Sequence, residues 1–382
     1  MRIVVAGAGL GGLAAAAGLR RAGHEVIVYE RAAELREAGT AIVIAPNGLR
    51  ALDRLDLTGR LRDHAVTAAS AGLRDRRGRP ILVTDARSAQ VTVGMAVSVT
   101  RTDLHQLLRA PLPPDAIHTA TPIDHLEPAG DEVAVISGGR TLTHADAAIV
   151  ADGIGSRLRA RLFPGHPGIR RIGRLDLRGM LPAPAGLDVD GLIASILIDR
   201  RTGAMFGLFP VDRNRLYWFT DSALPHPTPT LEQAKQQMLD LMRDWHPAVP
   251  ALIAATPAED VYVDPIARLA EPLPTFALGR IALLGDAAHA MTPDLGQGAG
   301  QAFEDAAALA RHLTGAAPAD VPSRLLRYDA ERRPRANRLM LASDRQSRLT
   351  SQTGAKAWLR DTLLRAVPPR LAARGLAGIW QL

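Results

Sequence analysis

Residues 3–30 read IVVAGAGLGGLAAAAGLRRAGHEVIVYE, and this stretch decides the fold. The apolar run at 3–6 is typical of a buried parallel strand, and the alanine-rich segment 13–22 predicts a helix. Residues 25–29 predict a second strand with Glu30 at its end. A strand, a glycine turn, a helix, a strand and an acid in this order predict a dinucleotide-binding βαβ unit.

The glycines of this turn have separate tasks. Gly7 permits the turn, Gly9 lets the backbone approach a pyrophosphate, and Gly12 lets the helix pack closely, with Gly11 in the same run. A phosphate bound here would meet the positive end of the helix dipole. Glu30 is placed to accept hydrogen bonds from ribose hydroxyls.

A second glycine-rich stretch, GDAAHAMTPDLGQG, occupies residues 285–298. We expect a buried strand at 281–284 before it and a helix at 299–313 after it. A flavin ring edge beside this helix start would face unpaired backbone N–H groups and a positive dipole end. Because reduced flavin is negatively charged, the helix start would stabilise it without a protonatable group.

Composition narrows the function classes. The chain has 382 residues, 47% of them hydrophobic, so we expect two lobes. Without cysteine we expect no disulfide, thiolate nucleophile or cysteine-based zinc or iron–sulfur site, and we expect no metal. The charge of +7 rests on arginine, since Lys235 and Lys356 are the only lysines. No basic run is interleaved with aromatic residues, so we expect no nucleic acid partner. Residues 3–19 imitate a signal peptide, but their glycines and the strand that follows favour a cytoplasmic protein without a membrane segment.

The middle of the chain has a stronger β character. A strand at 146–151 runs into Asp152-Gly153, at what looks like a strand edge opening onto a helix. Further elements are expected in the second half of the chain: strands at 174–181, 193–198, 204–211 and 216–220, a helix at 231–245, and arginine-rich helices from Pro322 onward.

These motifs together resemble one enzyme family. Gly7-x-Gly9-x-x-Gly12, Glu30-Arg31, Arg101 in TRTDLHQLL, Asp152-Gly153, Gly285-Asp286, Pro293 and Gly296-Gln297-Gly298 are similar to the motifs of the group A flavoprotein aromatic monooxygenases, which share the para-hydroxybenzoate hydroxylase fold. The strings AIVIAPNGLRAL and TPDLGQG are most similar to salicylate, 3-hydroxybenzoate and FAD-dependent urate hydroxylases. The resemblance covers essentially the whole chain.

The resemblance implies an α/β (α+β) fold. It has a doubly wound FAD-binding Rossmann domain of the GR2 type, an inserted β-sheet substrate lobe and C-terminal helices. The expected boundaries are 1–70, 100–165 and 265–325 for the FAD domain, 71–99 and 166–264 for the lobe, and 326–382 for the helical segment. No second glycine fingerprint for a nicotinamide is found.

The resemblance also implies a reaction. NADH or NADPH binds transiently and reduces noncovalent FAD, and O2 is captured as a C4a-hydroperoxide that hydroxylates an electron-rich aromatic or heteroaromatic small molecule. The protein must hold the substrate, exclude water and promote ionisation of a phenol. The partner is therefore a small aromatic substrate, and we expect a monomer or homodimer.

The roles implied for cofactor residues follow the family motifs. Glu30, with Arg31 beside it, is implied for the adenosine ribose, Arg101 for the ribityl or pyrophosphate region, and Asp286, after Gly285, for a ribityl hydroxyl. The flavin ring is implied to lie on Val43 and on Gly296, Gln297, Gly298 and Ala299. Asp152-Gly153 with Arg159 matches a motif assigned to both FAD and NAD(P)H. Asp152 and Asp286 could instead cap helices.

Substrate and catalytic residues are less clearly marked. Strand alternation places Met205 and Phe209 on one face and Tyr217 on a neighbouring strand, where they form a pocket wall or simply core. Tyr217 could bond a ring substituent, and Arg178 is a candidate partner for a substrate carboxylate or else an exposed strand charge. Pro293 is a candidate beside the flavin, and His289 is a candidate base or a structural histidine. The arginine that urate-type enzymes carry nearby aligns with Met205, so we expect a fairly apolar phenolic or heteroaromatic substrate.

Three alternatives remain beside aromatic hydroxylation. A flavin epoxidase or a hydroxylase of polycyclic antibiotics and other secondary metabolites would use the same motifs. A non-catalytic FAD-binding partner protein is a different class, although no motif is damaged. A flavin halogenase is disfavoured because the four tryptophans do not form its Trp-x-Trp signature.

Overall fold

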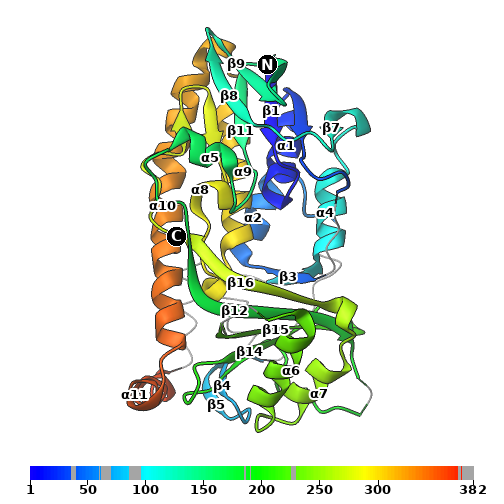
Figure 1. Ribbon diagram of the computed structural model, residues 1–382, viewed down its shortest axis with the longest axis vertical. Coiled ribbons are helices and arrows are strands. Elements are labelled where there is room, and N and C mark those ends of the chain that lie inside the picture. The colour runs from blue at the N-terminus through cyan, green and yellow to red at the C-terminus, as the bar shows by residue number, and fades with distance from the viewer. Residues whose placement is uncertain are drawn as a thin grey trace.

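The computed structural model places two sheets one above the other, with a long helix along one side (Figure 1). The upper part is a layered α/β unit, and the lower part is a larger sheet with helices on its far face. The residues that the structure describes are 1–35, 40–59, 61, 70–85, 96–184, 186–189, 191–224, 229–368 and 371.

The upper sheet carries the dinucleotide signature. Its described strands run in the order β17-β18-β11-β1-β2-β7, all parallel except β17 at the edge. The central strands are continuous apolar runs buried on both sides, as parallel strands between helical layers must be. Their bounds are β1 Arg2–Ala6, β2 Glu25–Tyr29, β7 Ile117–His118, β11 Ala147–Val150, β17 Ala277–Leu278 and β18 Ile281–Leu283.

Helices cover this sheet and form one core with it. α1 packs closely on α9, because a Cβ on Gly18 would lie 3.1 Å from Ala310 Cβ and one on Gly11 would lie 3.0 Å from Ala302 Cβ. The helices of this part are α1 Leu10–Arg21, α2 Pro46–Arg54, α4 Arg101–Arg109, α5 Arg157–Leu162, α8 Asp286–His289 and α9 Gly298–Leu313.

Two small antiparallel sheets flank the upper unit. One joins β3 Ala41–Ile44 to β6 Val97–Thr100 and leads into α2 and α4. The other joins β8 His125–Ala129, β9 Glu132–Ser137 and β10 Arg140–Ala145. The second of these was not predicted, because its alternation is short and mostly exposed.

The lower sheet is mixed and runs β16-β12-β15-β14-β13-β4-β5 among the described strands. One face packs its apolar side chains, such as Leu177, Phe206 and Trp218, against α6 Leu231–Met242 and α7 Ala248–Ala255. Its bounds are β4 Ser70–Asp75, β5 Pro80–Asp85, β12 Ile169–Pro182, β13 Ser195–Ile198, β14 Met205–Pro210, β15 Arg215–Ala223 and β16 Val261–Leu269.

The C-terminal helices connect the two parts. α10, Val321–Thr350, runs along the side of the molecule from the upper sheet to the lower one, and α11, Gly354–Arg365, lies against β5 (Figure 1). The expected arginine-rich tail helices are therefore present up to Arg365, and residues 372–382 lie outside the described part. No described helix is long and apolar enough to cross a membrane.

The expected fold class is confirmed, with parallel and antiparallel sheets and C-terminal helices. Some boundaries differ for clear reasons. α1 begins at Leu10 rather than residue 13, because Gly9 is its N-cap. The helix expected at 231–245 ends at Met242, and α7 follows as a separate helix after Pro247.

Candidate functional site

The N-terminal glycine turn has the geometry that its sequence predicts. Gly7 has φ of +113°, and a Cβ there would lie 2.4 Å from the Ala151 carbonyl oxygen. A Cβ on Gly12 would lie 2.0 Å from the Gly7 carbonyl oxygen. At Gly9, in contrast, a Cβ would meet no atom within 4 Å. The turn therefore closes tightly underneath and leaves its backbone open at Gly9, where the N-terminus of α1 begins.

Glu30 braces this turn from the end of β2. Its carboxylate accepts hydrogen bonds from the backbone N–H groups of Ala8 and Ala32, each at 2.8 Å. Arg31 beside it is exposed. The ring of His105 on α4 bonds the Ala8 carbonyl at 3.0 Å, so α4 also fixes the turn. The sequence analysis missed His105, although it lies inside the quoted string TRTDLHQLL.

The Asp152-Gly153 segment is a helix start. The N-cap of α5 is Ser156, whose hydroxyl accepts from the N–H of Arg159 at 2.8 Å, and Asp152 Oδ2 accepts from the N–H groups of Arg157 at 3.1 Å and Leu158 at 3.4 Å. Asp152 therefore supports the first turn of the helix without being its N-cap. Its other oxygen, Oδ1, is buried without a hydrogen-bond partner among the described residues. Gly153 has φ of +81° and open space where a Cβ would stand.

Arg159 ties this segment to the second motif. It is 4% exposed, and its guanidinium donates to the carbonyls of Ile154, Asp286 and Ala287 at 2.7, 3.3 and 3.2 Å. Burial lowers the pKa of Arg159, against the fields of Asp152 and Asp286. With these carbonyls as its partners, Arg159 positions the backbone between the two motifs.

Asp286 opens α8, and its N-cap is Gly285 with φ of +58°, so Asp286 does not cap the helix with its side chain. Its side chain is exposed, yet desolvation raises its pKa against the fields of His289, Arg101 and Arg159. Its exposed carboxyl group is available to a ligand.

His289 lies in the interior rather than in the site. It is 0% exposed, and Nε2 donates to Asp305 Oδ2 at 2.6 Å. Asp305 also accepts from the N–H of Gly285 at 3.0 Å and from Arg332 Nε at 2.8 Å. The candidate base role does not fit this burial, because no substrate reaches the ring. Asp305 and Arg332 were missed, although an Asp in the apolar helix 299–313 is itself a signal of a buried pair.

The start of α9 is open on its glycine side. Pro293 is exposed and begins a short 3₁₀ turn, Pro293–Leu295, that Gly296 ends in the left-handed conformation at φ of 60°. A Cβ on Gly296 or Gly298 would meet nothing within 4 Å. Gln297 is the N-cap and Ala299 the second residue of the helix. First-turn N–H groups therefore stand beside open space.

Gln297 itself points inward. It is 0% exposed, and its Oε1 accepts from Asn47 Nδ2 at 2.9 Å, while Asn47 also donates to Glu304 at 2.6 Å. Asn47 lies in the quoted string AIVIAPNGLRAL but was not assigned a role. Its contact couples α2 to the glycine loop before α9.

Arg101 stands where the upper unit meets the lower sheet. Its N–H donates to the Thr40 carbonyl at 2.7 Å, next to β3, on which Val43 pairs with Ser98. Burial lowers the pKa of Arg101, and the charges that act on it are Arg178, Asp286, Tyr217 and Asp264. Arg101 is therefore close to Asp286, which the sequence assigned to the cofactor, and to Arg178 and Tyr217, which it assigned to the substrate.

The face of the lower sheet towards β3 is apolar and aromatic. Tyr217 and Val211 pack with Ala41 of β3, joined by Met180, Phe209 and Phe219. The rings of Phe209 and Phe219 are stacked at 6.1 Å, and Tyr217 lies 6.3 Å from Phe219. Tyr217 and Phe209 therefore share one wall, as the strand alternation predicts.

Met205 and Arg178 are placed differently from the expected wall. Met205 packs with Ile81, Ile198 and Leu364 in a separate cluster beside α11. Arg178 Nε lies 3.1 Å from Asp176 Oδ2, and its Nη2 pairs with Asp264. Burial alone would lower the pKa of Arg178, but Asp176 and Asp264 raise it. Arg178 therefore already has two carboxyl groups beside it within the protein, of which Asp176 has its pKa raised to about 7 by burial.

These observations fit a bound dinucleotide. Two helix N-termini, at Gly9 and Gly298, stand beside open space, which suits phosphate groups and an anionic ring edge. Glu30, Asp286 and the orphan Asp152 Oδ1 are acceptors for ligand hydroxyls. Among the described residues no group of His, Asp or Glu side chains could hold a metal ion.

Comparison with known proteins agrees with this geometry. Residues 1–343 match a family described as an FAD binding domain. Aurachin C monooxygenase/isomerase of Stigmatella aurantiaca is 31% identical over 373 residues, which cover 96% of this chain and 94% of that protein. The 6-hydroxynicotinate 3-monooxygenase of Pseudomonas fluorescens is 32% identical, with 90% of each chain covered. The structure of Klebsiella pneumoniae HpxO complexed with FAD and uric acid superposes with a TM-score of 0.91 at 26% identity, over 100% of this chain and 97% of that one.

Proposed function

This chain belongs to the group A FAD-dependent aromatic monooxygenases, and we propose that it uses NADH or NADPH and O2 to hydroxylate an apolar heteroaromatic or phenolic ring that needs no carboxylate. The observation that carries the substrate class is an aromatic wall next to an arginine that already has carboxyl partners within the protein. Tyr217, Phe209 and Phe219 supply the wall, and Arg178 is held by Asp176 and Asp264.

The residues that would hold FAD lie along the upper unit. Glu30 would bind the adenosine ribose, the α1 N-terminus at Gly9 would bind the pyrophosphate, and Asp286 would bind a ribityl hydroxyl. Val43, Arg101 and the loop from Gly296 to Ala299 would hold the ring and its chain. FAD, when bound, supplies the two-electron redox chemistry and the activation of O2.

The chain's own residues provide charge stabilisation and a dry site. The N–H groups at the start of α9 stabilise negative charge at the ring edge without a proton donor. The Met180, Phe209 and Phe219 side chains exclude water from the reacting ring. Pro293 is an exposed residue of the turn before α9, and we place it beside the flavin.

Tyr217 positions the substrate. Burial raises the pKa of its phenol, and the nearby Asp176 raises it further. The hydroxyl therefore stays protonated at ordinary pH and acts as a hydrogen-bond partner for a ring substituent rather than as a base.

Two relatives support a heteroaromatic ring. Their names give aurachin C and 6-hydroxynicotinate as substrates of those proteins. Because 6-hydroxynicotinate itself has a carboxylate, these names support only the heteroaromatic ring. For this chain we favour such a ring without a carboxylate, because an unpaired carboxylate buried against Tyr217 and Phe209 would be strongly disfavoured. Nicotinamide preference, a monomeric or homodimeric state and a cytoplasmic location remain predictions.

The test is a matched substrate pair. FAD-loaded protein is supplied with NADPH or NADH and either 4-hydroxyquinoline or its 2-carboxylate, and product is measured by mass spectrometry. We expect ring hydroxylation of the neutral compound, with kcat/KM about tenfold or more above that of the carboxylate. A preference for the carboxylate would contradict the substrate class, and NADPH consumption that yields only hydrogen peroxide from the neutral compound would contradict the proposed hydroxylation.

A further inference from the structure

The outer face of α11 is apolar and exposed. Trp358, Leu359 and Leu363 are 54%, 52% and 61% exposed. They are three of the nine large hydrophobic side chains that stand exposed among the described residues, although α11 has only 12 residues. Single exposed leucines are common on soluble proteins, whereas a cluster of exposed apolar side chains marks an interaction surface.

The inner face of the same helix is firmly held at one corner of the molecule, at the end of α10 (Figure 1). Leu364 packs into the cluster that contains Met205. Asp361 is 4% exposed and pairs with Arg360 at 2.7 Å, and Arg360 Nη1 donates to the Leu349 carbonyl of α10 at 2.6 Å. Because α11 is anchored on this side, its apolar outer side is a formed surface rather than a loose end of the chain.

The exposed apolar side chains share one arc of the helix. At about 100° per residue, the arc from Trp358 through Leu359 to Leu363 covers about 140° of the circumference. Thr362 also lies in this arc, but its hydroxyl donates to the Trp358 carbonyl at 2.8 Å. The polar group inside the arc therefore has a partner within the helix.

A cation borders the arc on each side. At the same spacing, Lys356 stands about 20° beyond Leu363, and Arg365 stands about 20° before Trp358. Both cations are exposed, and neither makes an ion pair with a described residue. An apolar arc between basic borders is the pattern of a helix that lies in the surface of a membrane.

Acidic side chains on α11 and on the last turns of α10 do not cancel this charge. Asp361 is buried against Arg360. Asp344 of α10 is held by Arg268 at 2.9 Å and by Arg348 at 2.5 Å. The exposed charge that remains beside the arc is therefore positive.

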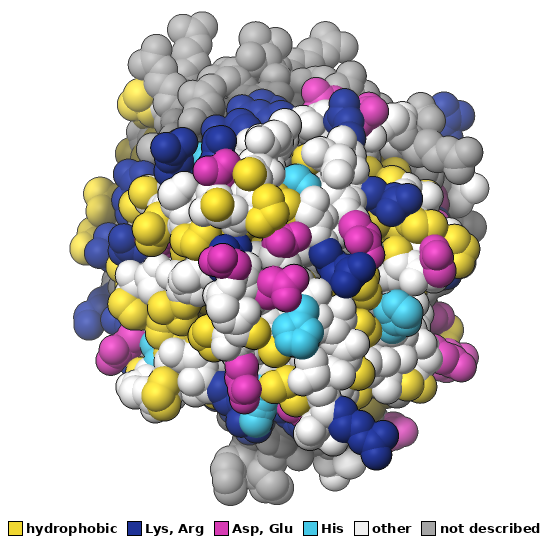
Figure 2. Space-filling model, turned by 90° about the horizontal axis from the view of Figure 1, so that it is seen from above, with side chains coloured by type: hydrophobic (Ala, Val, Ile, Leu, Met, Phe, Trp, Pro, Cys, Tyr) yellow, Lys and Arg dark blue, Asp and Glu magenta, His cyan; other side chains and the backbone are white. Residues whose placement is uncertain are grey.

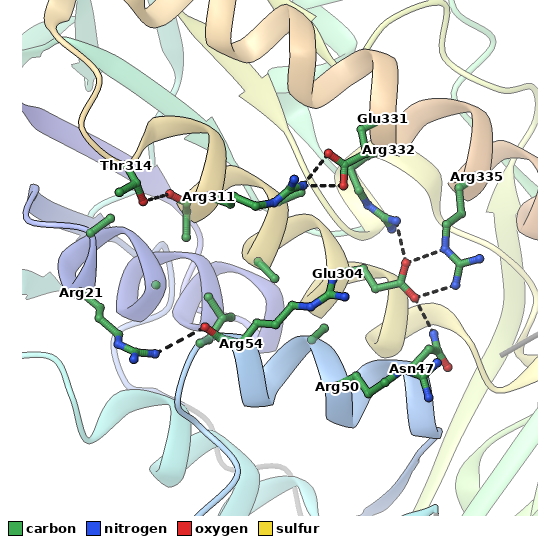
Figure 3. A pocket seen from close by; sticks show the side chains of 17 residues that line it. Arg21, Asn47, Arg50, Arg54, Glu304, Arg311, Thr314, Glu331, Arg332 and Arg335 are labelled. Carbon is green, nitrogen blue, oxygen red and sulfur yellow. Dashed lines mark hydrogen bonds and ion pairs between the residues drawn. The ribbon is translucent and has the colours of Figure 1, made fainter. Parts of the chain in front are cut away.

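The borders of α11 differ in this respect from an arginine-rich region in the upper unit. In the cavity between α1, α2, α9 and α10, Glu304 pairs with Arg332 and Arg335, and Glu331 pairs with Arg311 (Figure 3). Those arginines have carboxylate partners within the protein. The two cations of α11 instead face outward beside an apolar surface.

We propose that α11 binds the surface of an anionic lipid bilayer, with its apolar arc below the headgroups and its bordering cations on their phosphates. A helix of 12 residues is about 18 Å long, too short to cross a bilayer, so α11 would lie in the plane of the surface. Tryptophan is favoured at that depth. Such a contact needs no membrane segment and is compatible with the expected cytoplasmic location.

A second copy of this chain fits the face less well than lipid does. In a two-fold contact the arc would meet its own copy, and the basic borders of the two copies would come together. Like charges brought together across an interface oppose association. Anionic headgroups would neutralise the same cations, so the charge favours a bilayer.

The test is flotation of the FAD-loaded full chain with vesicles of phosphatidylcholine that either contain or lack phosphatidylglycerol. We expect the chain to bind the vesicles that contain phosphatidylglycerol, to bind those without it several-fold less, and to be released by high salt. No binding to the anionic vesicles, or equal binding to both kinds, would overturn the proposal. These readouts do not depend on hydroxylation.

Paired leucine substitutions test the apolar arc without changing charge. Leu359→Ser combined with Leu363→Ser is expected to weaken binding to the anionic vesicles about tenfold. The matched control combines Leu326→Ser with Leu142→Ser, because these leucines are 60% and 41% exposed on the first turns of α10 and on β10. The control should bind like wild type, and equal loss in both double variants would overturn the proposal.

Paired charge reversals test the borders. Lys356→Glu combined with Arg365→Glu should abolish the preference for phosphatidylglycerol, whereas Arg327→Glu combined with Arg140→Glu, which reverses two exposed cations of α10 and β10, should keep it. A preference that survives in the first variant would overturn the proposal.

Two further outcomes would assign the apolar arc to another occupant and so overturn the proposal. One is a dimer, measured by light scattering, that the variant with Leu359→Ser and Leu363→Ser dissociates. The other is vesicle binding that appears only after residues 372–382 are removed, which would show that this segment occupies the arc. We expect neither.

Discussion

Gly9 and Gly12 lie three residues apart in one turn, but a methyl group would meet different surroundings at the two positions. At Gly12 it would collide with backbone, at 2.0 Å from the Gly7 carbonyl oxygen. At Gly9 it would enter open space. Gly12 is therefore needed for the fold, and we assign Gly9 to the ligand, although both residues are glycines of one motif.

Substituting each glycine separates these roles. Gly12→Ala is expected to lower the free energy of unfolding of FAD-free protein by about 2–3 kcal/mol, because backbone cannot move aside. Gly9→Ala is expected to change it by less than about 1 kcal/mol. Gly9→Ala should instead weaken FAD binding, because its methyl occupies the approach to the phosphate. Urea unfolding measures the free energy of unfolding, and titration with FAD measures the affinity for the cofactor. Equal effects of the two variants on stability would contradict this assignment.

Asp286 and Asp152 form a second contrasting pair. Asp152 accepts hydrogen bonds from first-turn N–H groups of α5, whereas Asp286 has an exposed side chain that caps nothing. We expect Asp286→Ala to weaken FAD binding about tenfold with little effect on FAD-free stability. Asp152→Ala should cost about 1 kcal/mol of stability through the lost hydrogen bonds to the helix N-terminus. Flavin fluorescence gives the affinity, and unchanged flavin affinity in Asp286→Ala would refute its ribityl role.

At the scale of elements, a buried charge network joins α8, α9 and α10. Asp305 on α9 is 0% exposed and holds His289 of α8, Arg332 of α10 and the N–H of Gly285. Burial alone would raise the pKa of Asp305, but His289, Arg332 and the Gly285 N–H together lower it. The network fixes the glycine loops relative to the long helix.

The lowered pKa sets the sign of a pH effect. The stabilisation that ionised Asp305 provides is fully present above the pKa of an Asp in the unfolded chain, about 3.9. It is lost as the pH falls through the lower pKa of the folded state. Asp305→Asn is expected to lower the free energy of unfolding by about 3–5 kcal/mol near neutral pH, because Arg332 loses its buried partner. The gap between variant and wild type should narrow in acid. Denaturant titrations over a pH series measure it, with exposed Asp131→Asn as control, and a gap independent of pH would contradict the network.

The local sequence pattern predicted much of the structure of the upper unit and less of that of the lower sheet. β2 matches the expected strand 25–29, and the glycine turn has the expected geometry, since adjacent residues determine both. The surroundings of three other side chains could not be predicted, because their partners come from distant segments of the chain. Met205 packs with Leu364, Arg178 pairs with Asp264, and His289 pairs with Asp305. Strand alternation gave the face on which Met205 and Arg178 lie but not what covers it.

At the scale of the whole molecule, the site belongs to both sheets. The pKa of Arg101 is affected by Asp286 of the upper unit and by Tyr217 and Arg178 of the lower sheet. Figure 2, seen from the top of the upper unit, shows basic, acidic and apolar side chains interspersed on that face. The distinctive chemistry therefore lies between the two parts rather than on that outer surface.

Tyr217→Phe tests whether the upper unit binds FAD while the lower sheet positions the substrate. Because Tyr217 lies on the lower sheet, the variant should bind FAD as tightly as wild type. Loss of one substrate hydrogen bond should lower kcat/KM about tenfold and raise the share of hydrogen peroxide. Because its phenol stays protonated, the variant should keep the pH profile of the wild type. A profile that loses an ionisation in Tyr217→Phe would instead identify Tyr217 as the base.

The central claim is that the chain transfers one oxygen atom from O2 to an apolar aromatic ring. The most direct measurement supplies FAD-loaded protein, NADPH and 4-hydroxyquinoline under ¹⁸O₂ and analyses the product by mass spectrometry. The account predicts a ring-hydroxylated product that carries one ¹⁸O atom. A product whose new oxygen comes from water, or hydrogen peroxide without any hydroxylated ring, would contradict it.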